Sequence, residues 1–152
     1  MARHFLLILL LAIPFSLTAR AATPLQVSDA WVRAAPPGTT VLAGYMTVSN
    51  PGKHAVVVDS VTSPDFGAVE IHRTVVEQGI ARMLPVEQLD IRANDRVVLQ
   101  PGSFHLMMFD PARPLPAGDE VTLLLHTRRG QCIRVSAPVI RATGNSHHHP
   151  HH

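Results

Sequence analysis

Short stretches of alternating apolar and polar residues recur along the chain from residue 28 onward, and proline or glycine separates them. A period of two residues predicts half-buried strands, and no window shows the 3.6-residue period of an amphipathic helix. Breaks fall, for example, at Pro36-Pro37-Gly38 and Gln100-Pro101-Gly102. We therefore expect an all-β domain, an antiparallel sandwich or barrel. The predicted strands are residues 28–34, 41–49, 55–62, 68–76, 80–84, 96–99, 104–109, 120–125 and 131–138.

The longest apolar run lies at the start of the chain. It covers residues 5–17, follows Arg3, and precedes small residues at Ala19 and Ala21. This order is typical of a secretory signal peptide, and the run is too short to cross a bilayer comfortably. A signal anchor is the alternative, and no cysteine stands at the cleavage point to carry a lipid. We expect a leader at 1–21, a folded domain at 22–142 and a flexible tail at 143–152, in a periplasmic protein with no membrane segment after cleavage.

Charge and cysteine content argue against two classes of protein. Of the 13 basic residues two lie in the leader, which leaves 11 against 11 acidic residues and no basic block for nucleic acid. Cys132 is the only cysteine, so no intramolecular disulfide can form. A blue-copper carrier needs two histidines and a cysteine, and no histidine or methionine closely follows Cys132. We expect Cys132 to be a buried strand residue.

Two histidines and two methionines form a candidate metal site. His72 and Met83 flank the turn signal Gln78-Gly79, and a two- or four-residue loop places both on one face of a hairpin. A three-residue loop places them on opposite faces. His105 and Met107 alternate with apolar residues in one strand, so they share the less buried face.

This donor set suits a soft metal ion. Two neutral imidazoles and two thioethers favour Cu(I) and bind hard cations poorly. A zinc enzyme using His72 and His105 is the less favoured alternative, because it lacks a third nitrogen, oxygen or thiolate ligand. Glu70 lies two residues before His72 on the same predicted face, where it could hydrogen-bond that ring. The other interpretation is that the methionines fill the core and the histidines are solvated.

The spacing His-x10-Met-x21-His-x-Met resembles the signature of PCuAC, the family of periplasmic copper chaperones that serve the CuA centre of cytochrome oxidase. Asp29-Ala30-Trp31-Val32-Arg33 and Ala43-Gly44-Tyr45-Met46 resemble its opening, and Val69-Glu70-Ile71-His72 and Gln100 to Met107 its metal region. The likeness extends from about Val27 to Ile140. Arg73 and Thr74 stand where such proteins often have an additional methionine.

The resemblance implies a cupredoxin-like Greek-key fold and a protein that moves copper without enzymatic turnover. It implies the Cu(I) ligands His72, Met83, His105 and Met107. It also implies two partners, the copper subunit of cytochrome c oxidase and a Sco-type thioredoxin-like chaperone. A copper-buffering or resistance protein without a dedicated acceptor is the alternative.

The end of the chain is rich in histidine. Such tracts are a metal-binding composition, and imidazole donors favour Cu(II). Pro150 interrupts the run as it would not interrupt an ordinary purification tag. We expect an auxiliary Cu(II) tail, with an inert or artificial extension as the alternative. Its candidate ligands are His147, His148, His149, His151 and His152.

Overall fold

The computed structural model describes residues 25–141, so the predicted leader and the histidine-rich tail lie outside the described residues. Within this range the chain forms ten strands and contains no helix, and so none that could span a bilayer. The prediction of an all-β domain is confirmed. The strands are β1 (Gln26–Arg33), β2 (Val41–Asn50), β3 (Val56–Thr62), β4 (Phe66–Glu77), β5 (Ile80–Val86), β6 (Leu89–Ile91), β7 (Asp95–Leu99), β8 (Phe104–Pro111), β9 (Glu120–Thr127) and β10 (Cys132–Ile140).

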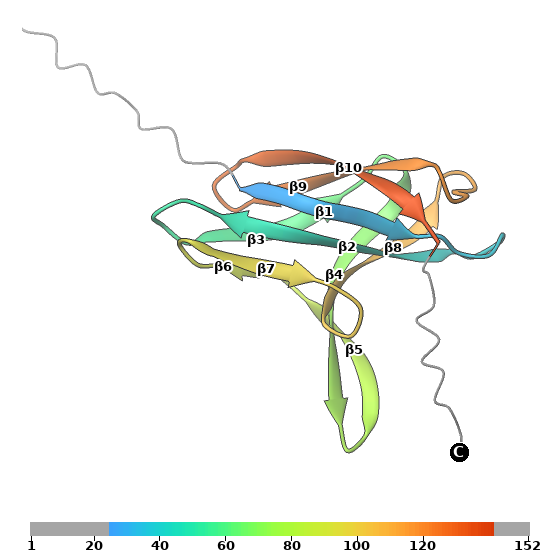
Figure 1. Ribbon diagram of the computed structural model, residues 1–152, viewed down its shortest axis with the longest axis horizontal. Coiled ribbons are helices and arrows are strands. Elements are labelled where there is room, and N and C mark those ends of the chain that lie inside the picture. Colours follow the sequence, from blue (N-terminus) through green and yellow to red (C-terminus); the bar gives the residue numbers. More distant parts are fainter. Residues whose placement is uncertain (1–24, 142–152) are drawn as a thin grey trace, which may run out of the picture.

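The strands are hydrogen-bonded in the order β5-β4-β8-β7-β2-β1-β10-β9-β3-β6, with β2 also pairing with β8 (Figure 1). Most neighbours are antiparallel, but β1 pairs with β10 in parallel and joins the two halves of the sheet. The buried apolar cluster draws on both halves, with Met108 and Leu106 from one and Leu123 and Val58 from the other. The sheet therefore folds over itself around one core, as a sandwich does.

The β4–β5 hairpin extends beyond this core and projects from the body of the domain (Figure 1). Its turn consists of two residues, Gln78 and Gly79, and both have positive φ angles of 53° and 79°. Two positive φ values are the mark of a type I′ turn, whose twist matches that of paired strands. Glycine adopts this conformation without strain. The turn therefore fixes the register of the hairpin at Glu77 opposite Ile80.

Two expectations are corrected by the strand pattern. β6 was not among the predicted strands, because three residues are too few to show alternation, although both Leu89 and Ile91 are buried. Cys132 is exposed instead of buried. Val135, Ala137 and Val139 face the core from β10, so the period of two turns Cys132 outward.

Asn50 at the end of β2 is nearly completely buried and ties two loops to the sheet. Its amide Nδ2 donates to three backbone carbonyls, and its Oδ1 accepts from the N–H of Gly52 at 3.0 Å. The carbonyls belong to His54, Ile91 and Arg92, at 2.8, 3.1 and 3.1 Å.

Replacing Asn50 with alanine leaves these buried groups without a partner. We expect Asn50→Ala to lower the free energy of unfolding by about 2 kcal/mol, measured by chemical denaturation. Ser49→Ala, at the half-buried neighbouring position, is the matched control and should change it little. Equal effects of the two variants would contradict this role of Asn50.

Candidate metal centre

The register of three neighbouring strands brings the four candidate ligands onto one face. His72 on β4 lies directly opposite His105 on β8, and their ring centroids are 6.0 Å apart. Met83 on β5 lies opposite Thr74, so the hairpin has the register that the two-residue loop predicts, with Met83 diagonal to His72. Met107 follows His105 by two residues and lies diagonal to His72 on the other side. The paired rings therefore lie between the two thioether positions.

The turn before β8 orients the His105 ring. Pro101 and Gly102 form the middle of a turn closed by the Ser103 N–H and the Gln100 carbonyl, at 3.0 Å, and Gly102 has a φ of 79°. Proline followed by glycine with positive φ is typical of a type II turn. The Ser103 carbonyl then lies 3.0 Å from His105 Nδ1. Because a carbonyl only accepts, Nδ1 is the protonated nitrogen of a neutral ring.

Sequence reasoning did not identify Ser103 as part of the site. Its carbonyl also accepts the backbone N–H of Thr74 at 3.1 Å, which fastens the turn to β4. The Gln-Pro-Gly-Ser sequence predicts the turn, but which strand the turn contacts depends on the pairing of β4 with β8. A local pattern carries no signal for that contact.

Glu70 orients the other ring. Its Oε2 lies 2.8 Å from His72 Nε2, so the predicted contact between them is present. The carboxylate accepts, and Nε2 is therefore the protonated nitrogen when the ring is neutral.

One nitrogen of each ring is left without a partner. His72 Nδ1 and His105 Nε2 are buried, and neither has a hydrogen-bond partner within the described part of the chain. As whole residues, His72 and His105 are 9% and 5% exposed, more buried than the sequence led us to expect. Buried polar atoms in native proteins are almost always satisfied, and a nitrogen lone pair can be satisfied by a metal ion.

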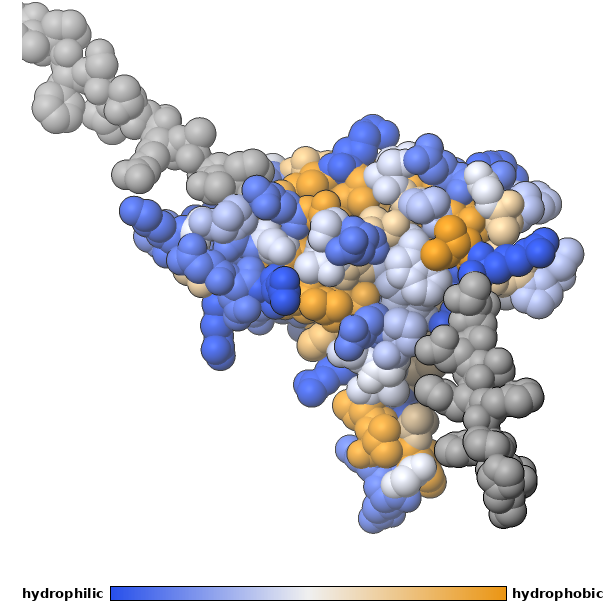
Figure 2. Space-filling view, viewed as in Figure 1, coloured by the Kyte–Doolittle hydropathy of each residue, from blue (hydrophilic) through white to orange (hydrophobic). Residues whose placement is uncertain are grey.

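The two methionines differ in their access to solvent. Met107 is half-buried, whereas Met83 is 59% exposed on the projecting hairpin. Val76, Ile80 and Leu84 are also exposed there, and apolar side chains gather at this end of the molecule in Figure 2. The interpretation of Met83 as a core residue is therefore wrong, because Met83 is not in the core.

The donor atoms on this face suit a soft, monovalent cation. Between residues 25 and 141, no three His, Cys, Asp or Glu side chains come together as a metal site, so a complete shell here needs the thioethers. Thioethers bind Cu(I) well and zinc poorly. Two buried imidazole nitrogens without a partner in the described residues, on the face that also carries both methionines, are a donor set that fits Cu(I) as cargo.

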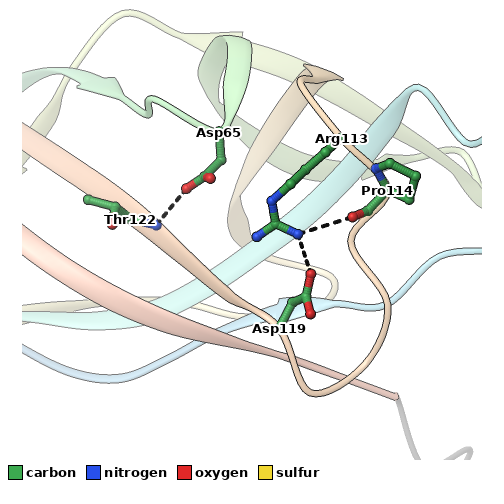
Figure 3. Close-up of polar contacts among 5 residues, drawn as sticks. All are labelled: Asp65, Arg113, Pro114, Asp119 and Thr122. Carbon is green, nitrogen blue, oxygen red and sulfur yellow. Dashed lines mark hydrogen bonds and ion pairs between the residues drawn. The ribbon is translucent and has the colours of Figure 1, made fainter.

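A spacious cavity among the described residues lies elsewhere. It has a volume of about 770 Å³ and is lined by proline-rich loops at the far end of β8, including Pro36, Pro111 and Pro114. Near it, Arg113 donates to the Pro114 carbonyl and pairs with Asp119 (Figure 3). None of the four candidate ligands lines this cavity.

Comparison with known protein sequences gives matches over most of the described chain. The model of the family described as putative lipoprotein LpqE-like matches residues 25–139. Putative lipoprotein Lxx21020 of Leifsonia xyli is 33% identical over 115 residues, which are 75% of this chain and 68% of the relative. The uncharacterized protein RP573 of Rickettsia prowazekii is 37% identical over 79 residues, or 51% of this chain and 44% of that protein.

Comparison with solved structures gives the same fold. The copper-bound PCuAC domain from PmoF2 superposes with a TM-score of 0.66 at 22% identity, covering 80% of this chain and 97% of that domain. The solution structure of CuI-DR1885 from Deinococcus radiodurans has a TM-score of 0.61 at 26% identity, covering 84% and 83%. The expected cupredoxin-like fold is confirmed by this likeness.

Proposed function

Because the chain belongs to the LpqE-like family and has the fold of PCuAC domains, we propose that it is an exported copper chaperone. In this proposal it binds one Cu(I) ion through His72, Met83, His105 and Met107 and passes it on without catalytic turnover. The observation that carries the proposal is a pair of buried nitrogens, His72 Nδ1 and His105 Nε2, that have no hydrogen-bond partner among residues 25–141 and lie on the face that also holds both methionines.

The unequal exposure of the ligands supports transfer by ligand exchange. The two histidines are buried, so in this proposal they bind the ion on its inner side, toward the body of the domain. Met83 is exposed, and its thioether is a neutral donor that an incoming ligand can replace. Exchange would therefore begin at Met83, and the ion would leave along the hairpin side of the site.

The cellular setting of the proposal comes from the leader and the family. The Leifsonia relative is named a putative lipoprotein, and residues 1–21 of this chain have the order of a signal peptide. We place the protein in the periplasm, with the copper subunit of cytochrome c oxidase as acceptor and a Sco-type thioredoxin-like protein as a second partner.

The test is anaerobic transfer of copper. The mature chain is loaded with one equivalent of Cu(I), mixed with the apo form of a soluble oxidase CuA domain, and separated from it. A chaperone delivers its copper faster than a small-molecule Cu(I) complex of equal affinity does. Retention of the copper, or delivery no faster than from that complex, would favour a copper buffer without a dedicated acceptor.

The histidine-rich tail is a candidate for binding additional copper. We propose that residues 145–152 bind Cu(II) through imidazole nitrogens. Deleting Asn145–His152 should abolish Cu(II) binding measured by calorimetry and leave the single Cu(I) site unchanged. Cu(II) binding that survives the deletion would contradict this assignment.

A further inference from the structure

We propose that Glu70 is a positioning residue that makes Cu(I) bind to His72 through Nδ1, while His105 binds through Nε2. This inference rests on the proposed function and goes beyond it, because it assigns the ligating atom of each ring and a residue that selects it. The two residues lie directly opposite each other on β4 and β8, and among the described residues the nitrogen without a hydrogen-bond partner is Nδ1 in His72 but Nε2 in His105.

The first step concerns His72. A neutral imidazole carries one proton, and its two nitrogens compete for it. The Glu70 carboxylate, 2.8 Å from Nε2, can only accept a hydrogen bond, so it retains the proton on Nε2. The lone pair is then on Nδ1, which is the atom that is buried without a hydrogen-bond partner in the described part of the chain. Carboxylates that receive the second N–H of a ligating histidine set the tautomer and raise the basicity of the ligand.

The second step concerns His105, where the arrangement is reversed. Its Nδ1 donates to the Ser103 carbonyl at 3.0 Å, and its Nε2 is the buried nitrogen without a partner. A main-chain carbonyl in a closed turn provides this contact, and a side-chain substitution does not remove it. Of the two hydrogen-bond acceptors, the Ser103 carbonyl and the Glu70 carboxylate, only the second can therefore be tested by mutagenesis.

The position of Glu70 gives it a second effect. It lies directly opposite Met107 on β8, on the face of the candidate ligands. Two neutral imidazoles and two thioethers leave the charge of Cu(I) uncompensated, and the carboxylate provides a negative charge beside it. The Glu70 side chain is 52% exposed, so solvent screens this attraction and the hydrogen bond is the larger contribution.

The experiment compares three variants of the mature chain. Glu70→Gln retains an oxygen acceptor for Nε2–H but loses the charge, and Glu70→Ala loses both. Glu77→Ala removes an exposed carboxylate from the same strand, on the opposite face, and is the matched control. Long-range ¹H–¹⁵N correlation spectra in mildly alkaline buffer report the tautomer of each ring without metal. The same spectra with Cu(I), which is diamagnetic, identify the nitrogen that binds.

In the parent chain, we expect His72 as the Nε2–H tautomer and a copper-dependent shift at its Nδ1, with the reverse at His105. Glu70→Gln should retain this pattern. Glu70→Ala should give a mixture of His72 tautomers and an affinity for Cu(I) about 10-fold weaker, whereas Glu77→Ala should change neither.

Copper bound through His72 Nε2, or an unchanged His72 tautomer in Glu70→Ala, would overturn the role of Glu70 and leave the chaperone proposal standing. A parent chain that binds no Cu(I) would overturn the proposed function itself. The tautomer spectra without metal separate the two failures, because they do not depend on copper binding.

Discussion

Replacing Met83 and Met107 together with alanine is expected to lower the affinity for Cu(I) by more than about 100-fold. Losing a residue that only supports a ligand already costs about 10–100-fold in metal affinity, and this variant loses two ligands. The two remaining histidines provide two nitrogens, which soft thioethers no longer complement. Anaerobic competition against a chromophoric Cu(I) chelator measures the change, in a chain that ends at Gly144 so that the histidine-rich tail cannot contribute.

The matched control is Leu84→Ala with Val76→Ala. Both side chains are exposed and apolar on the same hairpin, and neither is a donor. This control should retain a single tight Cu(I) site for each chain. A double methionine variant that binds as tightly as the control would contradict the four-ligand site, because Cu(I) would then be held in this tail-less chain without either thioether.

The fold was predictable because its signals are local. Strand β9 alternates in burial over all eight of its residues, and a turn with proline and glycine at residues 116–118 precedes it. β6 was not predicted from the sequence, because Leu89–Ile91 forms a strand through its pairing with β3, which is distant in sequence. Tertiary pairing rather than alternation makes this segment a strand.

The candidate site was predictable in part, and for a similar reason. The turn at Gln78-Gly79 determines which residues of β4 and β5 face each other. The sequence therefore left one question open for Met83, the length of this loop, which decides whether Met83 shares the face of His72. The contact between His72 and His105 joins strands that are far apart in the chain, and no local pattern determines that register. Only the family resemblance indicated that these two residues belong together.

The burial of the histidines shows where the pattern misleads. His105 alternates with Leu106 and Met108, which face the core, so alternation places it on the outer face. The structure retains this facing yet buries the ring, and the Ser103 carbonyl from the preceding turn contacts it there. A period of two describes the direction of a side chain but not what lies over it.

Exchanging the residues at two adjacent positions of β5 is expected to weaken Cu(I) binding about 10–100-fold, without changing the composition of the chain. In the variant Met83→Leu with Leu84→Met, the thioether moves by one residue. Leu84 lies opposite Arg73, whereas Met83 lies opposite Thr74 on the face of His72. Since adjacent residues of a strand point to opposite faces, the sulfur is carried to the far side of the hairpin.

The exchange leaves the fold of the hairpin intact, which makes the result specific. Both positions are exposed, so the free energy of unfolding should change little, and the Gln78-Gly79 turn holds the register. Leu84→Met alone is the control, because it adds a sulfur on the far face and should bind Cu(I) as the parent does. If the exchanged variant also binds as the parent does, Met83 is not a ligand, and the site would have to be completed from another strand.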